Sequence, residues 1–317
     1  MTDSPPTRPF RFAVQCARTQ SGRDWRNFAR RCENLGYSTL YVFDHFSDQL
    51  APLVSMAFAA EATRTLNVGC LVFANDFRHP VIFAREVATL DLLSDGRTEI
   101  GIGAGWMRRD YEKLGVRFDP PGDRISRLAE AIHIMKDLWE HGSSSFEGQH
   151  YTVDGSVGHP LPSTRPHPRL LIGGGGPRVL AFAAREADIV NMSPQLTEGK
   201  AGQQATDSTL AARYDQRLRW LREAAGERFP HLELQVLTSI GAVHVGRGRR
   251  AALESIAKTH GLSETDAAEW PRALVGSCDE ICDTLMARRA RYGINYVVIH
   301  EAELTAFAPV VERLVGR

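Results

Sequence analysis

Asp44 and His45 are the first side chains in this sequence whose types and spacing could do chemistry. They directly follow a run of β-branched and aromatic residues that predicts a strand over 38–43. A histidine, with an unperturbed pKa of roughly 6.5, can donate or accept a proton near neutral pH. The adjacent acid could fix the imidazole tautomer or cap the next turn. Spacing alone equally allows a structural histidine held by hydrogen bonds.

Small residues end another predicted strand, over 97–105, where Gly101, Gly103, Ala104 and Gly105 lead to Trp106. The pattern begins like a dinucleotide fingerprint, but no acidic residue closes a second strand about 20 residues on, so we do not predict a Rossmann fold. Small residues at a strand end let a planar ring approach the backbone. Trp106 could stack on such a ring or belong to the core of a lid.

A glycine run over 173–176 precedes Pro177 and Arg178 at the start of a predicted helix. Glycines before a helix N-terminus expose convergent N–H groups, and the helix dipole favours an anion there. Pro177 suits the first helical turn. We therefore predict phosphate binding, with a flexible turn as the weaker alternative. The sequence lacks the Gly-Lys-Ser/Thr of a nucleoside triphosphatase loop.

A strand predicted over 66–73 contains Gly69 and leads into a polar segment with Asn75, Asp76 and Arg78. The glycine permits a bulge or a close backbone approach, or simply fits a barrel interior. The polar residues are compatible with an ordinary loop. Together these stretches indicate a phosphorylated planar cofactor, with its ring near the second to fourth strands and its phosphate near the fifth.

An alternation of strands and helices would position these residues. We predict strands over 10–16, 38–43, 66–73, 97–105, 169–174, 187–193, 232–243 and 294–299. We predict helices over 23–36, 52–63, 81–94, 124–140, 179–186, 207–225, 249–260 and 278–293, and the stretch LTAFAPVVERLVG closes the chain. Repeated strand–helix units imply a parallel sheet, and eight of them favour an α/β fold closed into a (β/α)8 TIM barrel. An open doubly wound sheet is the alternative.

The segment over 142–168, rich in Gly, Ser, Pro and His, interrupts this alternation. Its stretch FEGQHYTVDG predicts a hairpin too short to bury a core, so we interpret the segment as a barrel insertion that could serve as a lid. We expect this insertion and the loop over 194–206 to determine the substrate. We predict a single domain over 1–317.

Composition excludes several other classes. Positive and negative side chains balance at a net charge of zero, so neither nucleic acid nor an anionic membrane is favoured as a partner. The five cysteines include no Cys-x-x-Cys pair, which predicts neither a disulfide framework nor a zinc site and fits a reducing cytoplasm. The N-terminal MTDSPPTRPF has no signal-peptide pattern, and no apolar run approaches the roughly 20 residues of a membrane helix.

Three stretches carry a resemblance to a known family. They are LGYSTLYVFDHF, NVGCLVFANDFRHPVIFAREVATLDLLSDGRTEIGIGAGWMRRDYEKLG and LLIGGGGPRVLAFAAREADIV. They resemble the luciferase-like monooxygenase superfamily, and within it the oxidoreductases that depend on coenzyme F420. The resemblance covers nearly the whole chain, is quite specific for the superfamily, and is less specific for F420 over FMN. It implies a TIM barrel with an insertion after the fourth or fifth strand, which fits 142–168.

The resemblance also implies roles for individual residues. His45 would be the active-site histidine near the reactive ring carbon, and Asp44 before it is more typical of the F420 branch. A non-prolyl cis peptide behind the ring would fall at Leu71-Val72, or one bond earlier. The remaining cofactor-binding residues are expected to be Ala104, Gly105 and Trp106 near the ring, and Gly173, Gly174, Gly175, Gly176 and Pro177 near the phosphate.

One departure from the sugar-phosphate dehydrogenase branch matters. A glutamate of that branch that serves in proton transfer is replaced here by Trp106, and the lysines expected to bind a sugar phosphate are not evident. Glucose 6-phosphate is therefore disfavoured as the substrate.

Three hypotheses follow for the function. The first is an F420-dependent oxidoreductase that transfers a hydride between the deazaflavin and a small organic substrate, with His45 handling the proton and Asp44 orienting His45 or tuning its charge. The second is an FMN-dependent two-component monooxygenase, and the third is a non-catalytic flavin-binding protein. We expect small molecules as partners, no nucleic acid, membrane or metal, and a homodimer, since relatives are commonly dimers.

Overall fold

The barrel strands are each four to eight residues long, and each overlaps a strand that the sequence predicts. The structure, a computed structural model, describes residues 8–196, 199–246 and 248–317, so predictions involving residues 1–7 and 197–198 lie outside the described residues. The strands are β1 (Arg11–Gln15), β2 (Thr39–Val42), β3 (Asn67–Ala74), β4 (Thr98–Gly103), β7 (Arg169–Gly174), β8 (Ile189–Met192), β9 (Glu233–Leu237) and β12 (Ile294–His300). They close in the order β1-β12-β9-β8-β7-β4-β3-β2. The predicted barrel is therefore confirmed, and the open sheet is wrong.

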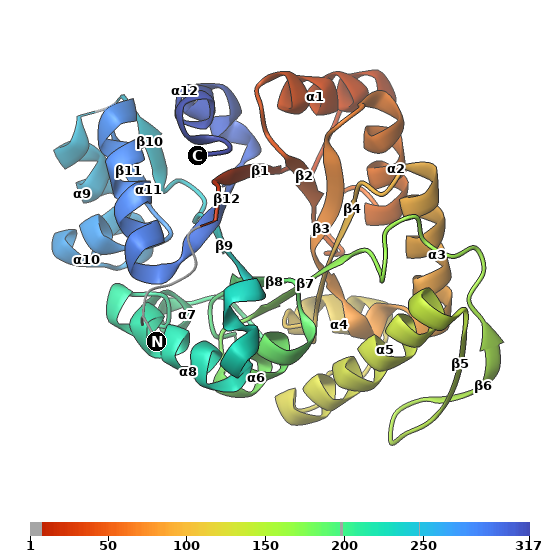
Figure 1. Cartoon of the computed structure of the whole chain (residues 1–317). Helices are drawn as coiled ribbons and strands as arrows, with labels where there is room; N and C mark the ends of the chain where they lie inside the picture. Colours follow the sequence, from red (N-terminus) through yellow and green to blue (C-terminus); the bar gives the residue numbers. More distant parts are fainter. Residues whose placement is uncertain (1–7, 197–198, 247) are drawn as a thin grey trace.

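Helices surround this barrel (Figure 1). They are α1 (Gly22–Asn34), α2 (Pro52–Ala62), α3 (Pro80–Leu93), α4 (Arg108–Leu114), α5 (Pro121–His141), α6 (Pro177–Glu186), α7 (Gln203–Asp207), α8 (Ala211–Ala225), α11 (Cys278–Tyr292) and α12 (Leu304–Leu314). Proline begins α2, α3, α5 and α6, where its missing N–H costs no helical hydrogen bond. In α1, the buried Trp25, Ala29 and Cys32 form the face turned to the sheet, as the spacing predicts.

Two predicted boundaries are wrong, and some short helices were not predicted. The strand expected over 232–243 ends at Leu237, because the chain turns at Gly241, whose φ of +73° is a left-handed conformation. The chain then forms β10 (Val243–Val245), which pairs with β11 (Leu274–Gly276) outside the barrel. The helix expected over 207–225 begins only at Ala211, as α8, and the segment expected to be a loop over 194–206 contains most of the short helix α7. The short helix α4 was not predicted, although Asp110 in its first turn and Gly115 at its end are ordinary helix signals.

A small satellite follows β9 and precedes α11 along the chain. It consists of β10, β11, α9 (Arg249–His260) and α10 (Glu264–Glu269), which lie together at one side of the barrel (Figure 1). It has its own apolar cluster, in which Trp270 and Ile256 are buried together. This segment brings the C-terminal end of α9 to the mouth of the barrel, where His260 lines the cavity.

The predicted hairpin in the insertion is confirmed. Its strands, β5 (Ser143–Glu147) and β6 (Thr152–Val157), pair antiparallel at the outer edge of the molecule beside α5 (Figure 1). Glu130 on α5 holds the hairpin by accepting backbone N–H groups of Gln149, His150 and Tyr151. The hairpin therefore packs against the side of the barrel.

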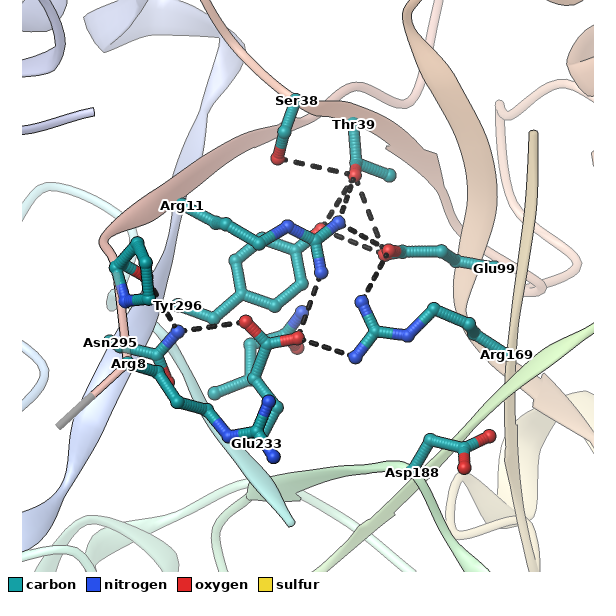
Figure 2. A network of polar contacts seen from close by, with 12 residues as sticks. Arg8, Arg11, Ser38, Thr39, Glu99, Arg169, Asp188, Glu233, Asn295 and Tyr296 are labelled. Carbon is teal, nitrogen blue, oxygen red and sulfur yellow. Dashed lines mark hydrogen bonds and ion pairs between the residues drawn. The ribbon is translucent and has the colours of Figure 1, made fainter. Parts of the chain in front are cut away.

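Charged side chains close the N-terminal end of the barrel (Figure 2). Glu233 on β9 pairs with Arg11 at 2.8 Å and with Arg169 at 2.7 Å, and both arginines also pair with Glu99 on β4. Burial alone would raise the pKa of the Glu99 carboxyl, but the charges of Arg11 and Arg169 outweigh burial and hold that pKa below its usual value. Glu99 is thus an ionised, fully paired carboxylate inside the barrel.

Two further observations concern the described part of the chain. No helix in it is both long and apolar enough to cross a membrane. All five cysteines are free thiols, and no group of three or more His, Cys, Asp or Glu side chains in the described ranges could hold a metal ion.

Candidate active site

A cavity of about 980 Å³ lies at the C-terminal ends of the barrel strands. That end is where enzymes with this architecture do their chemistry. The predicted site residues lie together in its wall, and they are Asp44, His45, Leu71, Val72, Ala104, Gly105, Trp106, Gly173, Gly174, Gly175, Gly176 and Pro177. The barrel brings them together because parallel strands all present their C-terminal ends at one mouth.

His45 is held by a carboxylate that the sequence analysis missed. Its Nδ1 lies 2.7 Å from Oδ2 of Asp110 on α4, whose other oxygen accepts the backbone N–H of Phe46 at 3.3 Å. Asp110 is buried, and His45 is partly exposed to the cavity. A carboxylate accepts hydrogen bonds, so Nδ1 carries the proton and Nε2 is the nitrogen available for proton exchange. Trp106 packs edge-on against the imidazole, with ring centroids 5.5 Å apart.

The prediction that Asp44 orients His45 is wrong. Both oxygens of Asp44 accept from Arg78, at 2.6 and 2.8 Å, and one also accepts the backbone N–H of Ala74. The Asp44 side chain is only 3% exposed, so its charge needs this fork of donors. Asp44 therefore links the end of β2 to the segment after β3. Its position next to His45 in the sequence did not reveal that its partner is Arg78.

The middle of β3 carries the predicted irregularity. The peptide bond between Leu71 and Val72 is cis, and the pairing of β3 with β4 shifts register between Cys70 and Phe73. The Gln15 side chain donates to the Leu71 carbonyl at 2.8 Å. Val72 thereby stands in the cavity wall, where its methyl groups face Gly103 on β4 and Gly173 on β7.

Gly105 has a conformation and a neighbour that exclude a side chain. Its φ is +74°, and a Cβ there would collide with the hydroxyl of Tyr111 on α4. Burial and the charge of Asp76 raise the pKa of Tyr111, whose hydroxyl donates to Asp76 at 3.1 Å. The Arg124 guanidinium donates to the Gly105 carbonyl. Tyr111 and Arg124 thus fix the backbone at Ala104 and Gly105 where it lines the cavity.

The glycine run forms the predicted loop before α6. A Cβ on Gly175 would lie 2.5 Å from the Ser193 carbonyl oxygen, so only glycine fits between β7 and the loop after β8. Gly176 is the N-cap of α6 and provides no side-chain cap. The first-turn N–H groups of α6, starting at Arg178 because Pro177 has none, are available to an anion.

The wall opposite β3 holds basic side chains that the sequence analysis did not single out. Arg272, from the satellite, donates Nε–H to the Leu237 carbonyl and has no ion pair among the described residues. His260 and His300 line the same end. Burial and the nearby Arg272 charge lower the pKa of both histidines, so both are neutral near pH 7. No local motif marks them, because they come from elements far apart in the chain.

Two expectations about the pocket loops have different outcomes. The described part of the 194–206 loop, including Gln195 and Gln203, lines the cavity. The insertion over 142–168 does not contribute a residue to the cavity wall, so its interpretation as a lid or substrate determinant is wrong for this structure. The hairpin is held against α5 instead, as described above.

Comparisons with known proteins give consistent results. The model of the luciferase-like monooxygenase family matches residues 8–263. An F420-dependent glucose-6-phosphate dehydrogenase of Amycolatopsis mediterranei is 31% identical over 198 residues, which are 60% of this chain and 58% of that protein. The same enzyme of Kribbella flavida is 30% identical over 255 residues, 77% of this chain and 72% of that protein. The chain thus covers less than two thirds of the first relative's length.

The fold has a close counterpart among solved structures. The coenzyme F420 dependent tetrahydromethanopterin reductase of Methanopyrus kandleri superposes with a TM-score of 0.76 over 96% of this chain and 98% of that one. Sequence identity is 16%, so this likeness concerns the fold.

Proposed function

The chain belongs to the luciferase-like monooxygenase family, and on that premise we propose that it is an F420-dependent oxidoreductase acting on a small organic molecule. One observation carries the proposal. His45, fixed by Asp110, shares a cavity with a rigid small-residue wall and a glycine loop at a helix N-terminus. The relatives named above as F420-dependent dehydrogenases support the choice of cofactor.

The described residues fit a phosphorylated deazaflavin. The N–H groups at the start of α6 would hold the phosphate, since Gly176 provides no competing side-chain cap. Ala104, Gly105 and Val72 would hold the ring, because all three line the cavity and the strand positions facing Val72 are glycine. The cavity of about 980 Å³ is at the upper end of the roughly 300–1,000 Å³ range of ligand sites, which suits a large cofactor with a small substrate.

The chain's own residues would position the reactants and move a proton. A bound deazaflavin supplies the hydride chemistry. The strand ends hold ring and substrate at one wall, which provides the orientation part of the rate enhancement. His45 Nε2 exchanges a proton with the substrate oxygen or nitrogen, and Asp110 keeps that nitrogen available by holding the proton on Nδ1. Trp106 restricts rotation of the imidazole through its edge-on contact.

We propose that the substrate of this chain differs from that of the relatives named above. Those relatives act on glucose 6-phosphate. Trp106 occupies the position at which that branch is expected to have a proton-transferring glutamate, and Arg272 is the main cation at the far wall. We therefore propose another small molecule as substrate.

A titration of the purified protein with F420 and, separately, with FMN tests the cofactor. Tryptophan fluorescence is a suitable readout because Trp106 lies in the cavity wall. Micromolar or tighter binding of F420, with much weaker FMN, is the expected result. The reverse order would assign the chain to FMN-dependent oxygenation, and oxygen consumption with reduced FMN would be measured next. Tight binding without turnover over a broad panel of alcohols, aldehydes and enones would favour a flavin-binding protein.

We also propose that the protein is a homodimer through α2 and α3. These helices pack side by side and expose Val54, Phe58, Ile82 and Leu93, of which Leu93 is 77% exposed. An exposed apolar face of this kind is typical of an interaction surface. Light scattering should give a dimer, and Phe58→Lys with Ile82→Lys should give a monomer. A monomeric unaltered protein would refute this part.

Five free thiols support a reducing, cytoplasmic setting.

A further inference from the structure

A chain of hydrogen bonds crosses the inside of the barrel from Glu99 to the floor of the cavity. The Tyr41 hydroxyl lies 2.7 Å from the Glu99 carboxylate, and Gln235 Nε2 lies 3.2 Å from the Tyr41 oxygen. Asn191 Nδ2 lies 2.8 Å from Gln235 Oε1, and the Ser193 hydroxyl contacts Asn191 Oδ1. Tyr41, Gln235 and Asn191 are buried, so water does not compete for these contacts. The upper members, Asn191 and Ser193, line the cavity.

The charge of Glu99 gives this chain one direction. Glu99 is ionised and buried between Arg11 and Arg169 (Figure 2), so it only accepts hydrogen bonds. Tyr41 has a single hydroxyl proton and directs it to that carboxylate at 2.7 Å, while the Tyr296 hydroxyl, 3.1 Å away, is a second donor toward the Tyr41 oxygen. The Tyr41 oxygen must then accept, so the amide NH₂ of Gln235 faces it.

The orientations of the next side chains, up to the cavity wall, follow in the same way. With its NH₂ facing Tyr41, Gln235 presents its carbonyl oxygen to the NH₂ of Asn191. Asn191 in turn presents its own carbonyl oxygen to the hydroxyl proton of Ser193. Ser193 has no second proton, so its oxygen offers only lone pairs to the cavity. Linked hydrogen bonds polarise one another, which further favours this orientation of the Ser193 hydroxyl.

Ser193 also has a defined place along the proposed cofactor. A Cβ built on Gly173 would lie 3.5 Å from Ser193 Oγ and 3.3 Å from Val72 Cγ1. Val72 belongs to the ring wall, and Gly175, two residues after Gly173, abuts the Ser193 carbonyl. If a bound molecule has its ring at Val72 and its phosphate at the start of α6, the segment that links ring and phosphate must therefore pass Ser193. In F420, as in FMN, that part is a polyol chain.

We propose that Ser193 binds the cofactor by accepting a hydrogen bond from one of its polyol hydroxyl groups, and that it favours a hydrogen-bond donor at this position. Glu99, Tyr41, Gln235 and Asn191 act through it as positioning residues, since their hydrogen bonds keep its proton turned away from the cavity. This inference rests on the proposed function for the identity of the ligand, but its chemistry requires only a ring and a phosphate joined by hydroxyl-bearing carbons.

The first test compares two ligands in fluorescence titrations of the full-length protein. One is F420, and the other is the same deazaflavin ring carrying a methyl group in place of the polyol and phosphate. Ser193→Ala should raise the Kd of F420 about two- to tenfold, the effect of one neutral hydrogen bond. It should leave the Kd of the ring-only compound unchanged. Ser239→Ala, which removes a hydroxyl from the cavity wall after β9, is the matched control and should change neither Kd.

A second test addresses the direction of the chain. Tyr41→Phe removes the link to Glu99 without touching the ligand, and it should raise the Kd of F420 by a smaller factor than Ser193→Ala. In a Ser193→Ala background it should have no further effect, because its influence passes through that hydroxyl. Circular dichroism should verify that each variant is folded. Equal effects of Tyr41→Phe in both backgrounds would overturn the directional argument.

The remaining outcomes separate this inference from the proposed function. An unchanged F420 Kd in Ser193→Ala, or an equal rise for the ring-only compound, overturns the inference and leaves the choice of F420 intact. If FMN binds and F420 does not, the cofactor proposal fails, and the same comparison with FMN and lumiflavin still decides the role of Ser193. If the unaltered protein binds neither cofactor, both are overturned.

Discussion

Replacing Arg78 with methionine should destabilise the protein strongly, although no catalytic group is removed. Arg78 is the only side chain that pairs with Asp44 in the described structure, through two hydrogen bonds of 2.6 and 2.8 Å. The Asp44 side chain is 3% exposed and that of Arg78 is 22% exposed. Removing one partner of a buried pair costs about 3–5 kcal/mol, because the other charge stays buried. The partial exposure of Arg78 favours the lower end, about 3 kcal/mol.

Urea unfolding followed by tryptophan fluorescence would measure this loss. With a slope of about 3 kcal/mol per molar, which suits a chain of this size, the midpoint should fall by about 1 M. Arg18→Met is the matched control, because Arg18 pairs with Asp48 at 3.2 Å on the surface, where the side chains are 67% and 89% exposed. An exposed pair contributes less than about 1 kcal/mol, so this variant should hardly move the midpoint.

A double variant sharpens the test. Arg78→Met combined with Asp44→Asn leaves no charge in this buried pair, and the amide oxygen that replaces the carboxylate can still accept the backbone N–H of Ala74. The double variant should therefore regain part of the stability that Arg78→Met loses. If Arg78→Met lowers the midpoint no more than Arg18→Met does, the assignment of Asp44 as a structural anchor would be refuted, and its role beside His45 would need another explanation.

Three other predictions follow from the same contacts. Gly105→Ala should lose more unfolding free energy, and more F420 affinity, than Gly115→Ala. Both glycines have positive φ, which costs a side chain about 1–2 kcal/mol, but only the first has a hydroxyl where its Cβ would stand; equal losses would contradict this. His45→Ala should lower turnover of any substrate found by about 10²–10⁴-fold with an unchanged cofactor Kd, and Asp110→Asn should lower it about tenfold or more, as expected for weakening a hydrogen bond to a charged group. Unchanged turnover would remove His45 from the mechanism. Because the folded-state pKa of Glu99 is depressed, its contribution to stability is present above its unfolded pKa of about 4.3 and is lost as pH falls through the folded value. Unfolding midpoints between pH 3 and 6 should therefore fall with acid in the unaltered protein and change less in Glu99→Gln.

The sequence by itself determined the architecture and most of one wall of the site. Alternating apolar runs and helical periodicity are local patterns, and they located each of the eight barrel strands to within a few residues, except that one predicted strand ran six residues past the end of β9. Glycine before a helix, as at Gly176, and small residues at a strand end, as at Gly105, depend on backbone geometry that is also local. These features could be recognised without knowing what lies beside them in space.

Only the tertiary structure decided which side chains meet. Asp44 is adjacent to His45 in the chain, yet it pairs with Arg78, while His45 pairs with Asp110, 65 residues away. Ser193 acquires its acceptor role from Glu99 at the opposite end of the barrel. Closing the barrel sets these partners, because strand order and register, rather than distance along the chain, determine which polar groups are buried together and must satisfy one another.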